Sequence, residues 1–406
     1  LENLFDGANF TRRNLSLRIL FYVVEAVNEH LKEKSAEFWD KKKFDVLMKV
    51  FDDSFEANKA MTIEIMKFIP VDVIRNFNTV SLKDLETLAT SIKPPDSLTA
   101  SYLMEFVVKF TSPGLFEMLN HLETLLISGL EVAEKSLIVA SSTNPLYGLI
   151  LGIRHLLSKL DLKALKSVEW REFFARLIKL CRRLTEVVAP VVNNSSPEGI
   201  LPKEEVHDDW MKIVEQTTPQ IILLCSWRTI KEVSLLLGDI CLRGALEVDQ
   251  FLTIGDHFLE LLSKTKHRGA FEQCFFGFSQ LCLRLWTCHE PELHKLPSEM
   301  LHQMINSIAG KDKERNELLT MKNLCATRRS AGLPFMIQAL ITSELKVSTN
   351  KNFHFVMKNL IEFCRHGEYL ETRTHSLNIL RALFRCSDLN ESIGEYIADG
   401  IKCAIL

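Results

Sequence analysis

Glycine and proline are scarce in this sequence, with 16 glycines and 12 prolines among 406 residues. Strand-and-turn folds need glycine at their turns, and phosphate-binding loops need it where the backbone approaches a ligand. The scarcity therefore argues against both. The Walker loop, the dinucleotide fingerprint and the Gly-x-Ser-x-Gly elbow of many hydrolases are also absent.

Long uncharged runs are missing as well. No stretch reaches the roughly 18 consecutive apolar residues that a membrane-spanning helix needs, so we expect no such helix. The ten cysteines include no Cys-x-x-Cys pair, which disfavours a zinc site. Because most of them sit in apolar runs, we interpret them as buried free thiols of a reducing compartment and expect a cytoplasmic location.

One run, from His289 to His294, looks at first like a zinc-protease motif. Its histidines are separated by Glu290-Pro291-Glu292-Leu293, and this spacing, with a proline between them, keeps them off a common helix face. No other arrangement of nucleophile, base or metal ligands is visible. We therefore predict no metal site, no cofactor and no enzymatic activity.

The charge balance is slightly acidic, with a formal net charge of −3. Hydrophobic residues make up 47% and charged residues 25%, which is typical of a folded chain. The net charge excludes a generally basic nucleic-acid coat, so any nucleic-acid binding must come from a local patch.

Apolar residues recur at a spacing of about 3.6 residues along the whole sequence, which predicts amphipathic helices joined by short turns. We predict an all-α, HEAT/armadillo-like helical-repeat solenoid, with several separate helical bundles as the alternative. Residues 1–143 would form N-terminal repeats and residues 144–406 a second region. The stretch 220–225 fits either a strand or a helix. The sequence begins without methionine and ends within an apolar pattern, so we expect it to be part of a longer protein. In the second half the spacing predicts helices at roughly 228–247, 250–265, 268–288, 297–309, 327–346, 350–365 and 370–386.

The segment Cys325–Phe335 combines two adjacent arginines with small residues, Gly332 and Pro334. Pro334 indicates either a helix that begins here or a longer helix that kinks. Free helix amides beside Arg328 and Arg329 could seat a phosphate or a carboxylate. The alternative is a helix boundary with two solvated arginines.

Other basic residues of the second half lie where we expect helices to begin. Arg228 and Lys231 are three apart on one helix face, and Arg268 opens another helix. Aligned helix ends in a repeat array would place such side chains along one edge, which suits a phosphate backbone. The alternative is local pairing, such as Arg228 with Glu232.

Six segments of the second half form a recognisable series: Asn144–Gly148, Ser196–Gly199, Ser226–Gly238, His267–Phe271, Arg328–Pro334 and His375–Phe384. In this order and spacing they resemble the thyroid adenoma-associated protein family over about residues 144–406. Residues 1–140 resemble it only through generic helical repeats.

The resemblance implies a function that residue spacing does not give. Family members are long helical-repeat proteins that bind an FtsJ-type methyltransferase, which uses S-adenosylmethionine. Together they modify the ribose 2′-hydroxyl of nucleotide 32 in the tRNA anticodon loop. We therefore expect a non-catalytic scaffold for methyltransferase and tRNA. The alternative that the resemblance carries is a protein-interaction scaffold regulating a membrane calcium pump and energy metabolism.

The candidate tRNA- or partner-binding residues are Arg228, Lys231, His267, Arg268, Arg328, Arg329, Ser330, Gly332, Pro334, Arg373, His375 and Arg381.

Overall fold

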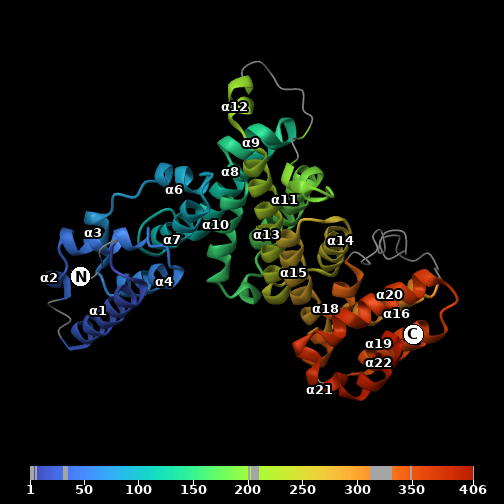
Figure 1. The fold of residues 1–406 in the computed structure, drawn as a ribbon. Helices are drawn as coiled ribbons and strands as arrows, with labels where there is room; N and C mark the ends of the chain where they lie inside the picture. The colour runs from blue at the N-terminus through green and yellow to red at the C-terminus, as the bar shows by residue number, and fades with distance from the viewer. Residues whose placement is uncertain are drawn as a thin grey trace. The chain divides into compact units, whose positions relative to one another are not determined.

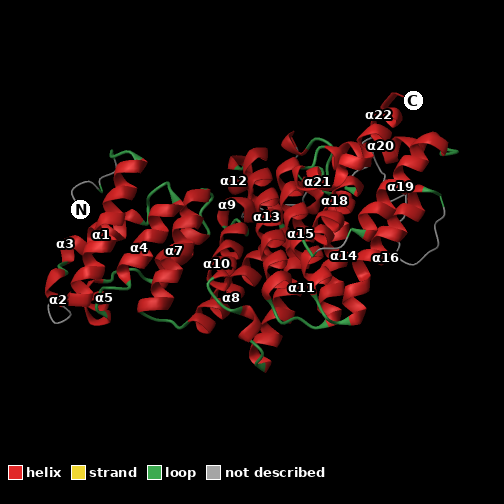
Figure 2. Cartoon of the chain, turned by 90° about the horizontal axis from the view of Figure 1, so that it is seen from below, coloured by secondary structure: helices red, strands yellow, loops and turns green. Residues whose placement is uncertain are grey.

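The computed structural model describes residues 4, 7–30, 35–199, 202, 210–310, 332–347 and 350–405. Across these residues every regular element is a helix and none is a strand (Figure 2). Most helices pack against helices that are near them in sequence, which is the mark of a repeat array. The prediction of an all-α helical-repeat solenoid is confirmed.

Contacts divide the chain into two compact units. The first comprises Leu1–Leu160 with Lys203–Cys225. Its helices are α1 (Phe10–His30), α2 (Ser35–Phe38), α3 (Lys41–Val50), α4 (Glu56–Met66), α5 (Val71–Phe77), α6 (Leu82–Ala89), α7 (Pro94–Phe110), α8 (Leu115–Lys135), α9 (Leu137–Thr143), α10 (Tyr147–Ser158) and α12 (Met211–Gln216).

A buried carboxylate joins α7 and α10 within this first unit. Glu105 is almost fully buried and accepts bonds from His155 at 2.7 Å and Lys109 at 2.5 Å. Burial alone would raise the pKa of Glu105, but these two bonds outweigh it and lower the pKa to about 2. The group is therefore an ionised structural anchor at neutral pH.

The second unit comprises Asp161–Pro202 with Ser226–Leu406. Its helices, coloured from green to red in Figure 1, are α11 (Val168–Val192), α14 (Val248–Lys264), α15 (Arg268–Thr287), α16 (Pro291–Ile308), α18 (Leu333–Leu345), α19 (Lys351–His366), α20 (Leu370–Phe384), α21 (Asn390–Ile393) and α22 (Ile397–Ile405). Four 3₁₀ turns lie at Leu162–Ala164, Pro197–Gly199, Ser387–Leu389 and Gly394–Tyr396.

The helix α13 (Pro219–Arg243) differs from its sequence prediction. It was expected to begin near 228, but it begins at Pro219 and includes the stretch 220–225, which is thus helix and not strand. Proline is favoured in the first turn because its missing N–H has no helical partner there. No helix breaker separates this turn from Trp227, so one long helix forms. Arg228 consequently lies in its middle and not at its start.

Two prolines also mark where α16 and α18 begin. The helix α16 starts at Pro291, with Glu290 as its cap, so the expected start at 297 was wrong and Pro297 lies inside the helix. The helix α18 is capped by Gly332 and carries Pro334 in its first turn. Of the two alternatives for Pro334, a helix start and a kink, the start is therefore correct.

A buried carboxylate links α18 to the start of α19. Glu344 is fully buried, and its two oxygens accept from the backbone amides of Asn352 at 3.0 Å and Phe353 at 2.9 Å. The side-chain amide of Asn352 adds a third bond at 2.8 Å. These amides belong to the first turn of α19, where a negative charge also complements the helix dipole. Glu344 thus caps α19 from a neighbouring helix.

The nine cysteines within the described ranges are all buried free thiols, as the sequence predicted. Burial raises the pKa of several of them, among them Cys181, whose pKa rises to about 12. They behave as small apolar core residues. None of the helices in the described part of the chain is long and apolar enough to cross a membrane.

Candidate nucleic-acid interface

The start of α15 is fixed by its own cap and by α11. The ring Nδ1 of His267 accepts from the Ala270 amide at 3.2 Å, so the histidine takes the N-cap role. The amides of Lys266 and His267 both donate to the carbonyl of Val192, at 2.9 and 3.1 Å. Burial lowers the pKa of His267, while Glu198 acts in the opposite direction. The ring is therefore neutral at neutral pH, as an accepting Nδ1 requires.

Trp227 brings two of the predicted site residues together. Its ring stacks on His267, with centroids 5.5 Å apart and planes inclined by 21°. The Arg228 guanidinium carbon lies 5.1 Å from the centroid of the Trp227 ring, which is within cation–π distance. A basic and aromatic cluster thus forms where α13 meets the start of α15.

A second aromatic contact lies one turn further along α15. The Phe271 ring meets Phe335 of α18 edge-on at 4.9 Å, and Phe275 meets the same ring at 5.7 Å. All these rings are partly exposed, and Phe335 is 38% exposed. We call Trp227, His267, Phe271, Phe275 and Phe335 the aromatic row. It runs across α13, α15 and α18.

Gly332 sets the position of Phe335. A side chain at this glycine would overlap the backbone carbonyl of Leu262 in α14, whose carbon would be 2.8 Å from the added Cβ. Only glycine lets the first turn of α18 approach α14 this closely. The three residues from Gly332 to Pro334 are buried, and Phe335 is the first side chain of the helix to reach the surface.

Beside Phe335 a surface pocket of about 350 Å³ opens between α18 and α20. Two arginines line its wall: Arg381 in the last turn of α20, and Arg385 at the C-cap of the same helix. Both are exposed, and neither has a carboxylate of the described residues within 4.0 Å. The amide of Gln338 donates to Cys386 Sγ at 3.3 Å. We call this the α18–α20 pocket, and its lining comprises Pro334, Phe335, Gln338, Asn378, Arg381, Ala382, Arg385 and Cys386.

Some of the predicted site residues thus fall into two clusters that the aromatic row connects. Arg228 and His267 meet through Trp227, and Pro334 and Arg381 line one pocket. The expectation that the basic residues mark helix starts was wrong for Arg228, which is in the middle of α13, whereas Arg268 begins α15 and Arg373 lies in the first turn of α20. Arg381 lies in the last turn of α20.

The remaining predicted residues lie apart from these clusters. Lys231 pairs at 3.2 Å with the buried Glu232, and Arg268 pairs at 2.8 Å with Glu272 on an exposed surface. The Arg373 Nε donates to the Gly367 carbonyl at 2.9 Å.

His375 also lies apart from the two clusters, because it is on the buried face of α20. His375 is 7% exposed, and its burial lowers the pKa of the ring, with Glu371 opposing. Its side chain lies in the interior. Arg328, Arg329 and Ser330 lie outside the described residues.

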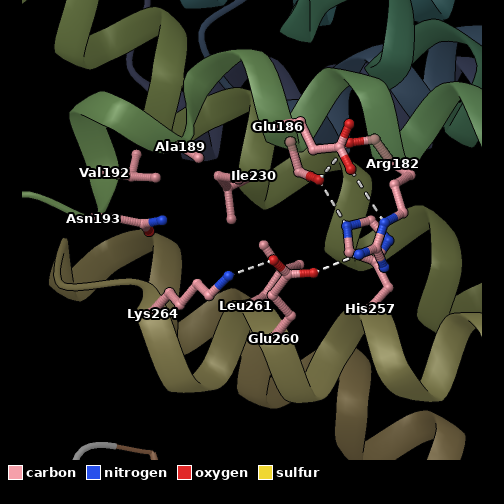
Figure 3. Close-up of a pocket in the computed structure, with 11 residues that line it drawn as sticks. Arg182, Glu186, Ala189, Val192, Asn193, Ile230, His257, Glu260, Leu261 and Lys264 are labelled. Carbon is pink, nitrogen blue, oxygen red and sulfur yellow. Dashed lines mark hydrogen bonds and ion pairs between the residues drawn. The ribbon is translucent and has the colours of Figure 1, made fainter. Parts of the chain in front are cut away.

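A smaller cavity of about 30 Å³ lies between α11 and α14 and is shown in Figure 3. Thr185 Oγ1 contacts His257 Nε2 at 2.7 Å and donates to the Arg182 carbonyl at 2.8 Å, so the ring N–H donates to the hydroxyl. Arg182 pairs with Glu260 at 2.5 Å, and Lys264 pairs with the same carboxylate at 2.7 Å. The space holds about one water molecule.

Burial, with the positive charge of Arg182, lowers the pKa of His257 to about 4, while Glu260 opposes the shift. The ring is therefore neutral at neutral pH, and the polar groups around it are satisfied by one another. These contacts are structural, because they join α11 to α14. Over the part of the chain that the structure covers, no group of three or more His, Cys, Asp or Glu side chains could hold a metal ion.

A family model described as THADA/TRM732, DUF2428 matches residues 172–406, the region that contains the aromatic row and the α18–α20 pocket. The chain belongs to the THADA/TRM732 family. The resemblance seen in the sequence segments is thereby confirmed.

Curated relatives extend the similarity beyond the range 144–406 that the segments indicated. A Drosophila melanogaster protein is 35% identical and a Mus musculus protein 32% identical over 100% of this chain; both are named tRNA (32-2'-O)-methyltransferase regulator THADA. The Schizosaccharomyces pombe protein named tRNA (32-2'-O)-methyltransferase regulator trm732 is 26% identical over 68% of the chain.

The chain spans 26% of the length of the two animal relatives and 19% of the fission yeast relative. No solved structure matches it.

Proposed function

We propose that this chain is a non-catalytic part of a regulator that binds an FtsJ-type methyltransferase and tRNA and directs 2′-O-methylation of nucleotide 32 in the anticodon loop. The partner enzyme would hold the S-adenosylmethionine. Membership of a family whose curated relatives are named tRNA methyltransferase regulators supports the regulatory role. Buried free thiols are compatible with action in the cytoplasm.

The observation that carries the tRNA part of this proposal is the exposed face of α20. Arg373 and Arg381 are exposed there, as is Arg385 at the C-cap, and none of the three has a carboxylate within 4.0 Å among the residues that the structure describes. Elsewhere in the same unit arginines are neutralised, as in the pairs of Arg243 with Asp239 and Arg365 with Asp399, both at 2.5 Å. Guanidinium groups without a protein carboxylate are suited to phosphate oxygens.

The test measures tRNA affinity at several salt concentrations for the double variant Arg381→Gln/Arg385→Gln. Each lost phosphate contact should lower the slope of log K against log salt by roughly 0.7 to 0.9, so the double variant should lose about 1.5. The matched control is Arg12→Gln/Arg18→Gln, which removes the same charge from two exposed positions of α1. If both double variants lose the same affinity and slope, the α20 face has no special role in tRNA binding.

A second measurement connects binding to the modification. The wild type and each double variant are used to pull down the FtsJ-type enzyme. Ribose methylation at nucleotide 32 of tRNA is then mapped in the presence of each protein. We expect the α20 variant to retain the enzyme while methylation falls. Normal methylation with this variant would contradict the tRNA role of α20.

A further inference from the structure

The α18–α20 pocket combines three kinds of group that are seldom found together on a surface. Arg381 and Arg385 supply two positive charges, Phe335 supplies an exposed aromatic ring, and Gln338 and Asn378 supply side-chain amides. Among the residues that the structure describes, no aspartate or glutamate lines it. A ligand that satisfies all three kinds carries a negative charge, a flat ring and a hydrogen-bonding edge.

The size of the pocket limits what can enter. Its volume of about 350 Å³ is near the lower end of the range for small-molecule sites, which is roughly 300 to 1,000 Å³. A double helix could only rest its phosphates on the rim. One extruded nucleotide, in contrast, is of a size to enter.

Phe335 is held as a rigid platform. Phe271 and Phe275 contact its ring at interplanar angles of 75° and 71°, so both meet it close to perpendicular. Gly332 lets the start of α18 pack directly against α14, which fixes the backbone from which the ring projects. Ring–base stacking tolerates any base and is how proteins hold unpaired nucleotides.

The two arginines are placed for the phosphate of the same nucleotide. Arg381 projects from the last turn of α20 and Arg385 from the C-cap that follows it, while Phe335 comes from α18 on the other wall. Gln338 is oriented by its bond to Cys386, and its amide carries both donor and acceptor atoms.

We propose that the α18–α20 pocket binds one unstacked nucleotide of a single-stranded RNA segment, with its base on Phe335, its phosphate on Arg381 and Arg385, and its base edge towards Gln338. This inference rests on the proposed function, because it takes tRNA as the ligand. It adds that the pocket contacts an unpaired loop nucleotide and not the stem. The rest of the aromatic row, towards Trp227, lies on the path that neighbouring nucleotides would follow.

The test uses the full chain and three labelled probes: a hexauridine, a 17-nucleotide RNA stem–loop and a blunt RNA duplex. The variant Phe335→Leu keeps an apolar side chain but removes the aromatic face. We expect it to bind hexauridine and the stem–loop roughly tenfold more weakly, with duplex binding and the salt slope unchanged. Phe335→Tyr keeps the ring and should bind within about twofold of the wild type.

The matched control is Phe276→Leu, at a phenylalanine of α15 that is 52% exposed and does not line the pocket. It should bind every probe as the wild type does. Thermal melting of each variant shows whether a loss of binding is only a consequence of unfolding. Phe335→Tyr should retain both the melting temperature and the RNA affinity of the wild type.

The outcomes separate this inference from the proposed function. If Phe335→Leu binds hexauridine normally while Arg381→Gln/Arg385→Gln does not, the nucleotide pocket is wrong and the phosphate-binding face stands. If neither variant loses affinity, both proposals fall. If polyglutamate displaces hexauridine from the wild type and from Phe335→Leu equally well, the site is an acidic-peptide site and the nucleotide proposal is overturned.

Discussion

The ring of Phe335 stands edge-on to that of Phe271, with centroids 4.9 Å apart and an interplanar angle of 75°. The pair joins the first turns of α15 and α18. An edge-on partner adds roughly 0.5 to 1.5 kcal/mol beyond the area that it buries. Because the contact uses the edge of one ring, it stabilises Phe335 without covering the ring completely.

A double-mutant cycle measures this pair directly. We expect Phe271→Leu and Phe335→Leu each to lower the free energy of unfolding, and the double variant to lose about 1 kcal/mol less than the sum of the two. Urea unfolding of the wild type and the three variants gives the coupling. Strict additivity would mean that the two rings do not hold each other.

Gly332→Ala tests the close approach of α18 to α14. The added Cβ would overlap the Leu262 carbonyl, so the two helices must move apart, at a cost of roughly 1 to 3 kcal/mol. Thermal melting should show a decrease of about 5 °C. Gly394→Ala is the control, because nothing lies within 4 Å of its Cβ position. Equal melting of Gly332→Ala and the wild type would show that the helices do not touch there.

His257 predicts a pH dependence of stability. Burial, aided by Arg182, lowers the pKa of the folded-state ring from 6.5 to about 4. Between these values the unfolded chain binds a proton that the folded ring does not. The contribution of His257 to the free energy of unfolding is therefore fully present above pH 6.5. It is lost as the pH falls towards 4, by up to about 3 kcal/mol.

The measurement is urea unfolding at intervals from pH 7.5 to 4, for the wild type and His257→Gln. In the variant, the free energy of unfolding should fall less steeply between pH 6.5 and 4 than in the wild type. Carboxylates contribute to the slope of both proteins at the acid end. Parallel curves for the two proteins across the whole range would refute the assignment.

Glu344→Gln tests the cap that α18 provides for α19. An amide keeps one accepting oxygen but loses the charge and the second acceptor, so we expect a loss of about 2 kcal/mol in the free energy of unfolding. Glu362→Gln, at an exposed position of α19, makes the same chemical change and should cost almost nothing. Equal stability of the two variants would argue against the cap.

Helical periodicity predicts most of the fold, because each helix buries one face and apolar residues recur along that face. Pro334 gave the start of α18 for the same local reason, a fixed backbone angle without an amide donor. The start of α13 differs from the predicted one because Pro219 already begins the helix, ahead of the basic segment at Arg228. Helix phase also places His375 on the buried face of α20, with Thr372, Ile379 and Leu383.

Only part of the candidate site could be predicted from the sequence. Pro334 and Arg381 were named from separate segments, but their meeting in one pocket depends on how α18 packs against α20, which local spacing does not record. Local spacing indicates neither the surface exposure of Phe335 nor its proximity to Arg385. The signal for Arg385 was its spacing of one helical turn from Arg381, with no acidic residue on that face of the helix.

The first turn of α15 supports both halves of the aromatic row, since His267 stacks on Trp227 and Phe271 meets Phe335 edge-on. That turn is held by the His267 cap and by two hydrogen bonds from backbone amides to the Val192 carbonyl. A local opening there would release both aromatic contacts together, without unfolding the rest of the unit. The hydrogen-exchange rate of the Ala270 amide therefore reports how often the whole surface comes apart, and an RNA that spans the row should slow it.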